Sequence, residues 1–209
     1  MEQNAQLLRE MAAKAGAETW EDRKKNQTPQ CKFGEDGICC RICSMGPCRI
    51  TPKASKGICG ADAHAIAGRN YVRFIAGGTA AHSDHGREIA HVLHVSSRDG
   101  NYIIKDEQKL LRLAKEWGVA TEDRDIYEVA HEVAEIGLME YGKPFGTLRY
   151  LERATEERQK LWEELDIAPR AIDREIATVM HMTHMGCTAD AEALVMQGMR
   201  TGLSDGWGG

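Results

Sequence analysis

Hydrophobic residues recur at intervals of three and four along most of the chain, and this spacing is typical of amphipathic helices. Leu7, Leu8 and Met11 follow it within residues 3–16, and it resumes after Asp62, a residue type that often caps the start of a helix. No run of residues predicts a strand ladder. The pattern therefore predicts an all-α fold with an irregular, cysteine-rich loop between two helical parts.

Glycines and prolines divide the second helical part into several predicted helices. The sequence Gly77-Gly78-Thr79 predicts a break in the helix that begins at Asp62, because two adjacent glycines disfavour a continuous helix. Thr79 or Ser83 would then cap another helix that runs to about Ser97. The remaining predicted helices cover residues 105–117, 125–138, 147–163, 171–185 and 189–202.

Composition limits the class of protein. With 209 residues, of which 42% are hydrophobic and 28% charged, the chain is long enough to bury a core. We expect one combined helical domain, in which residues 1–60 contain the amino-terminal helix and the cysteine-rich loop and residues 61–209 form a helical bundle. A net charge of −5 and the lack of a basic stripe argue against a nucleic-acid partner.

The ends of the chain bear on its compartment and completeness. The first residues carry charges through an amphipathic pattern and lack the apolar core of a secretory signal, and no later run predicts a membrane span. We therefore expect a cytoplasmic protein, in which clustered cysteines are more often metal ligands than disulfides. The final LSDGWGG has no polar tail and predicts a truncated chain, although a flexible end gives the same pattern.

Six of the seven cysteines fall between residues 31 and 59. Cys40, Cys43 and Cys48 form a C-x2-C-x4-C pattern, and Cys59 closes a plausible set of four thiolate ligands. This spacing suits a [4Fe-4S] cubane, and the glycines of the loop let backbone N–H groups approach the cluster sulfurs. The alternative is a zinc site with four cysteine ligands, but the second C-x2-C knuckle typical of such sites is missing. The spacing favours iron–sulfur over zinc.

Two cysteines of the loop, Cys31 and Cys39, remain outside this set. Two thiolates cannot complete a four-iron cluster within one chain, but two chains related by a two-fold axis could each supply such a pair. The alternative is two free buried cysteines, or a pair that lies behind the ligands. Spacing alone leaves this choice open.

A family resemblance bears on both groups of cysteines. The stretch CKFGEDGICCRICSMGPCRI and the following KGICGADAHAIAGRNYVRFIAGGTAAHSDHGREIAHVL closely resemble the amino-terminal part of the nickel–iron carbon monoxide dehydrogenases of anaerobes. The later THMGCTADAEALVMQGMRTGLSDGWGG also resembles that family. The resemblance implies that Cys31 and Cys39 bind a [4Fe-4S] or [2Fe-2S] cluster shared across a homodimer axis. It implies an internal [4Fe-4S] cluster on Cys40, Cys43, Cys48 and Cys59.

In that family both clusters pass electrons outward from a buried nickel–iron–sulfur centre, which oxidises CO with water to CO2, two protons and two electrons. The catalytic chain of the family is much longer than this one, and its nickel ligands lie beyond the position where this sequence ends. We therefore expect the nickel–iron–sulfur centre and the doubly wound α/β domains only in a complete protein, and this segment alone to be inactive. The resemblance also implies a ferredoxin-like electron acceptor and admits an acetyl-CoA synthase subunit as a partner.

Histidines form the second candidate site. His82, His85 and His91 match positions at which the family carries histidines that relay protons between the nickel centre and solvent, whereas Glu88 stands where a histidine is expected. A carboxylate, with a reference pKa of about 4.3 against about 6.5 for imidazole, would alter such a relay. An interval of three residues also drifts by about 60° around a helix, so the side chains would need bridging waters. The alternative is a set of polar histidines around a surface helix.

The sequence therefore predicts an amino-terminal segment of a carbon monoxide dehydrogenase that supplies electron-transfer clusters and a dimer interface. A stand-alone iron–sulfur electron-transfer or assembly protein without the nickel site is the first alternative. A zinc-stabilised helical interaction module is the second.

Overall fold

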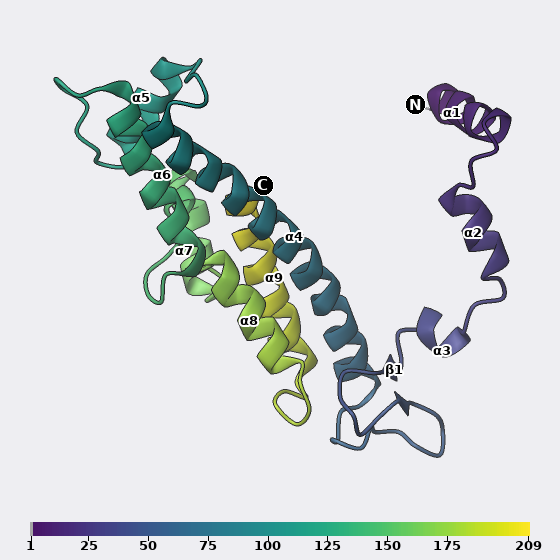
Figure 1. Ribbon diagram of the computed structural model, residues 1–209. Coiled ribbons are helices and arrows are strands. Elements are labelled where there is room, and N and C mark those ends of the chain that lie inside the picture. Colours follow the sequence, from purple (N-terminus) through teal and green to yellow (C-terminus); the bar gives the residue numbers. More distant parts are fainter. Residues whose placement is uncertain (1) are drawn as a thin grey trace.

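The computed structural model describes residues 2–209 and consists of a helical bundle with an extended arm at its amino-terminal end (Figure 1). The arm contains three short helices, α1 (Glu2–Lys14), α2 (Trp20–Asn26) and α3 (Lys32–Glu35). None of these helices contains a buried residue. The helix predicted within residues 3–16 is confirmed, whereas the sequence pattern did not predict the two short helices that follow it.

One long helix, α4 (Ala63–Asp99), forms the axis of the bundle. The Asp62 side chain accepts a hydrogen bond from the Ala65 backbone N–H at 2.9 Å, which confirms the predicted start. The helix ends at Gly100, whose φ of 64° is the left-handed conformation that glycine adopts easily.

The predicted break at Gly77-Gly78-Thr79 is wrong, because α4 continues through these residues. The buried positions Val72, Ala76, Thr79 and Ser83 repeat every three or four residues on both sides of the two glycines. The face that packs against the bundle is therefore continuous. Its burial outweighs a cost of about 1 kcal/mol for each glycine in a helix interior.

Three helices pack along α4: α6 (Ile126–Gly142), α8 (Ile172–Met182) and α9 (Ala191–Gly208). A fourth, α5 (Glu107–Glu116), packs against α6. The predicted helices at 105–117 and 125–138 are confirmed. The helix predicted to end at residue 185 ends earlier, where the Thr183 hydroxyl donates to the Val179 carbonyl at 2.7 Å, and the last helix extends past residue 202.

The single helix predicted at residues 147–163 is wrong. A 3-10 helix (Arg149–Arg153) is followed by α7 (Glu156–Glu164), and Ala154 between them is extended. The Gln159 amide donates to the Ala154 carbonyl at 2.7 Å, so a side chain replaces the backbone donor that a continuous helix would supply.

Among residues 2–209, the strand pairing lies in the cysteine-rich loop. Two short antiparallel strands, β1 (Cys39–Cys40) and β2 (Cys48–Arg49), place Cys40 opposite Cys48. The all-α fold class is confirmed, with this two-stranded exception to the expectation of no strand ladder.

Buried side chains form three groups along the molecule. One lies between α4, α8 and α9, a second lies between α5 and α6, and a third lies under the cysteine-rich loop at the start of α4. Their central members are Val72, Ala76, Val179 and Leu194, then Leu110, Ala114, Val129 and Val133, then Cys40, Ala61, Ala65 and Ile66. Within residues 2–209 no helix is both long enough and apolar enough to cross a membrane.

Candidate metal centre

Four cysteines of the loop line one pocket next to the start of α4. The β1–β2 pairing brings Cys40 and Cys48 together, and the connecting loop and the chain before α4 add Cys43 and Cys59. Most of the other side chains of the pocket are apolar and include Ile42, Met45, Ile58, Ile66 and Met185. The structure therefore gathers the same four cysteines that sequence spacing selected for the internal cluster.

Two glycines lie close to the cysteines, and the packing of the loop backbone requires the one at position 46. A Cβ at Gly46 would lie 2.9 Å from the Cys48 backbone nitrogen and 3.1 Å from the Cys40 carbonyl oxygen, which is too close for any side chain. A Cβ at Gly57 would lie 3.5 Å from the Cys48 sulfur. The absence of a side chain at Gly46 thus lets the loop backbone fold closely on itself beside Cys40 and Cys48.

A buried arginine ties the pocket to the bundle. The Arg69 side chain on α4 is almost fully buried, and its Nη1 donates to the Cys59 sulfur at 3.4 Å. Its Nε donates to the Thr188 carbonyl between α8 and α9 at 3.1 Å, and Nη2 donates to the same oxygen. The backbone N–H of Ala61 and the Arg69 guanidinium lower the pKa of Cys59, which favours the thiolate form that binds metals.

The other two cysteines, Cys31 and Cys39, lie outside this pocket. Cys31 is exposed at the start of α3 in the arm, and Cys39 is partly exposed. The Asn70 amide on α4 donates to the carbonyls of Gly37 and Cys39 at 3.0 and 3.1 Å, which fixes this strand to the bundle. Both thiols of the pair are therefore at least partly accessible to solvent.

The donor set fits an iron–sulfur cluster. Four thiols converge on one apolar pocket that also offers backbone N–H groups, and this is the usual environment of a cubane. Zinc with four cysteine ligands remains chemically compatible with the same four residues.

The histidines predicted as a relay lie along α4 without contacting one another. His82 Nδ1 lies 3.0 Å from both carboxylate oxygens of Asp205 on α9. His85 lines a separate pocket with aromatic residues of α6 and α9, and the His91 ring centroid lies 6.4 Å from that of His94. Among the hydrogen bonds within residues 2–209, none joins His82, His85 and His91 to each other.

Sequence reasoning missed a group near the carboxyl end of α4. His94 meets His131 and Glu135 of α6, and the ligand atoms of the three residues lie within 4.8 Å of one another. The spacing of His131 and Glu135, one helical turn apart, was the available signal. Their partner on a different helix was not predictable from local sequence.

Residues 38–209 match the sequence profile of the Prismane/CO dehydrogenase family. The chain belongs to this family. Among its curated members, carbon monoxide dehydrogenase 1 of Methanosarcina acetivorans is 50% identical over 210 residues, an alignment that covers 98% of this chain and 33% of the relative. Carbon monoxide dehydrogenase 1 of Carboxydothermus hydrogenoformans is 45% identical over 206 residues, an alignment that covers 93% of this chain and 32% of the relative.

Solved structures of the Prismane/CO dehydrogenase family show the same fold. The Ni-free carbon monoxide dehydrogenase of Thermococcus sp. AM4 superposes with a TM-score of 0.87 at 46% identity, over 95% of this chain and 32% of that one. A second structure is a chain of an acetyl-CoA synthase/carbon monoxide dehydrogenase, described with NiZn[Fe4S4] and NiNi[Fe4S4] clusters in its alpha subunits. It also superposes with a TM-score of 0.87, at 36% identity, over 94% of this chain and 30% of that one. The present chain therefore spans about a third of the length of the relatives it matches.

Proposed function

We propose that this chain is the amino-terminal, cluster-binding part of an anaerobic nickel–iron carbon monoxide dehydrogenase. The complete protein would oxidise CO with water to CO2, two protons and two electrons. The observation that carries the proposal is the convergence of Cys40, Cys43, Cys48 and Cys59 on one pocket, in a chain that belongs to the Prismane/CO dehydrogenase family. The nickel–iron–sulfur centre would be held by residues of the remaining two thirds of such a protein.

The work of this segment is electron transfer. A [4Fe-4S] cluster bound by the four cysteines supplies a one-electron carrier. The Ala61 backbone N–H and the Arg69 guanidinium would favour the thiolate form of Cys59, and the apolar side chains of the pocket would exclude water from the sulfurs. Both effects favour a stable cluster at neutral pH.

Cys31 and Cys39 would each contribute to a cluster shared with a second copy of the chain, of the [4Fe-4S] or [2Fe-2S] type. Their position outside the internal pocket and their exposure support this role. The arm, which buries no residue against the bundle, is free to contact a partner subunit. The functional unit would then be a homodimer in the cytoplasm, with a ferredoxin-like electron acceptor and, in some settings, an acetyl-CoA synthase subunit.

His82, His85 and His91 are proposed to carry protons along α4, with Glu88 in place of a further histidine. Their separation requires water molecules between them. The exposure of His82, His85 and His91 leaves room for such waters.

The experiment that tests the cluster assignment compares three variants of the chain, each purified without oxygen and analysed for iron, zinc, nickel and acid-labile sulfide. We expect four irons per wild-type chain from the internal cluster and half of the irons of the shared one, which gives about six irons for a shared [4Fe-4S] cluster and about five for a shared [2Fe-2S] cluster. The double variant Cys31→Ala, Cys39→Ala should retain about four irons and lose the dimer. Cys43→Ala should lose the internal cluster.

Cys187→Ala provides the matched control, because Cys187 is exposed and lies outside the loop. It should retain the metal content of the wild type. About one zinc per chain without labile sulfide would reject the iron–sulfur assignment in favour of the zinc module. Unchanged iron in the double variant would reject the shared cluster alone.

A further inference from the structure

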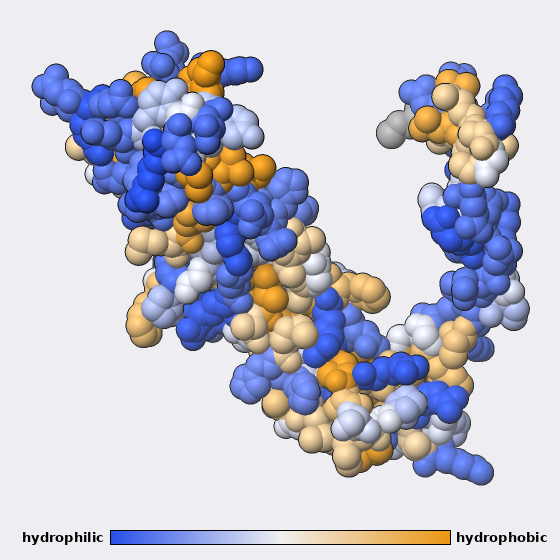
Figure 2. Space-filling view, viewed as in Figure 1, coloured by the Kyte–Doolittle hydropathy of each residue, from blue (hydrophilic) through white to orange (hydrophobic). Residues whose placement is uncertain are grey.

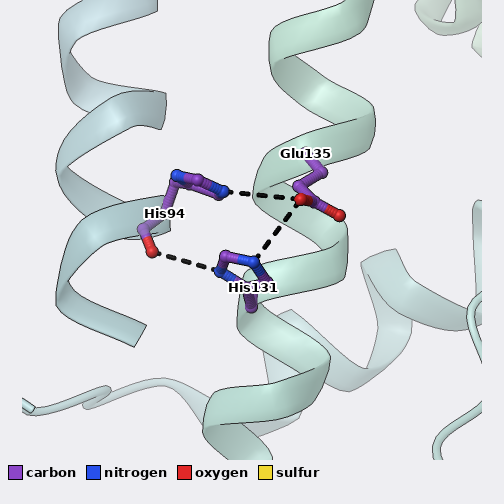
Figure 3. Close-up of side chains that lie close together, drawn as sticks. All are labelled: His94, His131 and Glu135. Atoms are coloured by element: carbon purple, nitrogen blue, oxygen red, sulfur yellow. Dashed lines mark hydrogen bonds and ion pairs between the residues drawn. The ribbon is translucent and has the colours of Figure 1, made fainter. Parts of the chain in front are cut away.

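Two histidines and a carboxylate from two helices meet on the bundle (Figure 3). The group lies near the carboxyl end of α4, whereas the cysteine-rich loop precedes the start of that helix. His94 Nε2 lies 3.6 Å from Glu135 Oε1, and His131 Nε2 lies 3.5 Å from the same oxygen. The two imidazole rings stack with their centroids 4.2 Å apart. We propose that His94, His131 and Glu135 form a binding site for a divalent transition-metal ion of the zinc type.

The hydrogen bonds of His131 select the protonation state that a metal ligand needs. The His131 Nδ1 atom lies 3.2 Å from the His94 carbonyl oxygen and 3.1 Å from Ser97 Oγ, whose own proton goes to that carbonyl at 2.7 Å. The Arg98 guanidinium, which can only donate, lies 2.9 Å from Nε2. His131 therefore carries its proton on Nδ1 and presents a lone pair on Nε2.

The two distances from the imidazole nitrogens to the Glu135 carboxylate are close to those of a tetrahedral site. Metal bonds of about 2.0–2.1 Å place neighbouring tetrahedral ligands about 3.4 Å apart. Both distances to Glu135 Oε1 are within a few tenths of an ångström of this value, and the two imidazole nitrogens are at most 4.8 Å apart. The Glu135 side chain is 53% exposed, so it can move with the ion as the imidazoles close on it.

The surroundings leave a place for a fourth ligand. His131 and Glu135 border an open hollow whose other side chains include Glu128 and Glu132, so water can complete the coordination. Imidazole and carboxylate ligands together suit zinc, cobalt, nickel and copper ions better than magnesium or calcium. Two partly buried imidazoles, 21% and 20% exposed, add rigidity that an isolated surface histidine lacks.

An ion pair without metal is the alternative use of the same three residues. In that case Glu135 would pair with a positively charged imidazole and no metal would be bound. The guanidinium of Arg98 lies beside His131, so it disfavours a positive charge on that ring. The zinc affinity after removal of Arg98 distinguishes the two arrangements, because an ion pair without a metal site predicts no change in that affinity. A metal ion competes with Arg98 for the Nε2 lone pair, so its removal should tighten metal binding.

The test is a zinc titration of the chain and its variants, with bound zinc quantified by elemental analysis and affinity measured by competition with a chelator. Because the loop cysteines also bind zinc, each variant is compared with the wild type in the same cysteine background. We expect His131→Ala and Glu135→Gln each to lose one zinc per chain, and Arg98→Gln to bind that zinc several-fold more tightly. His181→Ala, which removes an exposed histidine from α8, should behave as the wild type does.

The exposed positions of Glu135 and Arg98 keep the test informative if His131→Ala fails to fold. Cobalt substituted for zinc provides a second readout, since its visible spectrum reports nitrogen and oxygen ligands separately from thiolates. Equal zinc content in wild type and Glu135→Gln, or unchanged affinity in Arg98→Gln, would overturn the proposal. This inference stands independently of the proposed electron-transfer role, because none of its residues contributes to the cysteine site.

Discussion

At the scale of single residues, the bundle contains a fully buried carboxylate that is held entirely by donors. Glu175 on α8 accepts hydrogen bonds from the Arg170 side chain at 2.7 and 2.8 Å, from the Arg170 backbone N–H at 2.9 Å and from the Gln197 amide at 2.9 Å. Burial raises the pKa of Glu175, but these donors together lower it by a larger amount. The net pKa is therefore below the usual value. The ionised form is therefore part of the folded structure.

This network predicts a specific dependence of stability on pH. A carboxyl group whose pKa is lowered by folding stabilises the fold above its unfolded pKa, near 4.5, and this contribution is lost as the pH falls through the folded value. Glu175→Gln should lower the free energy of unfolding at pH 7 by about 3 kcal/mol, because it leaves Arg170 without its charged partner. The difference from wild type should shrink below pH 4.5, as measured by urea unfolding.

Glu157→Gln, on the exposed α7, serves as the control and should follow the wild type at every pH. A difference between Glu175→Gln and wild type that stays constant as the pH falls well below 4.5 would show that the ionised carboxylate does not carry this stability.

At the residue scale, the structure brings together the cysteines that sequence spacing had grouped, because their grouping is local. The four cysteines of the internal site lie within twenty residues of one another (40 to 59), and short spacing constrains which of them can converge. The role of Arg69 was not predictable, because its partners Cys59 and Thr188 come together only when α4 packs beside the loop before α9. Local spacing carries no information on such contacts.

At the scale of elements, the crossing of α4 and α9 depends on small residues. A Cβ at Gly198 would lie 2.8 Å from Val72 Cγ1 and 3.3 Å from Ile75 Cδ1, whereas a Cβ at Gly77 would meet nothing within 4 Å. Both glycines lie inside helices. They therefore form a matched pair that separates helix propensity from packing.

Gly77→Ala should stabilise the protein by up to about 1 kcal/mol, because alanine favours the helix and the site is open. Gly198→Ala gains the same propensity but must displace Val72, at a cost of about 1–3 kcal/mol. In urea unfolding, the free energy of unfolding of Gly198→Ala should therefore be lower than that of Gly77→Ala by about this cost. Equal midpoints for the two variants would mean that the helices separate without cost at this crossing.

The same comparison explains which element boundaries were predictable. Asp62 marks the start of α4 by a local hydrogen bond, so sequence alone identified it. The pair Gly77-Gly78 is a local signal for a break, but the buried face of α4 is set by its packing against α6, α8 and α9. Where local propensity and tertiary burial disagree, burial decides, and burial is visible only in the folded structure.

At the scale of the whole molecule, the arm and the bundle differ in how many of their apolar side chains are buried. Figure 2 shows the arm as a largely hydrophilic extension with apolar side chains gathered near α1, and Leu7, Leu8 and Met11 are more than half exposed there. By contrast, Leu194 and Thr201 on α9 are fully buried. The sequence predicted α1 but gave no sign that it stands apart from the bundle, because an amphipathic pattern does not identify the surface that the apolar side covers.

This difference predicts opposite results from two deletions. Removal of residues 2–26 should leave the free energy of unfolding of the bundle unchanged, because α1 and α2 bury no residue. Removal of residues 191–209 should prevent cooperative unfolding, because it strips the buried face of α4 of its longest partner. Both deletions are measured by urea unfolding followed by circular dichroism.

The arm could extend into solvent or bind a second copy of the chain, and the dependence of stability on protein concentration distinguishes these two roles. If the arm only extends into solvent, the deletion of residues 2–26 has no effect at any concentration. If its apolar side chains bind a second copy of the chain, the full chain gains stability as concentration rises, whereas the deleted form does not. A loss of stability that is independent of concentration would contradict both, since it would require contacts between the arm and its own bundle.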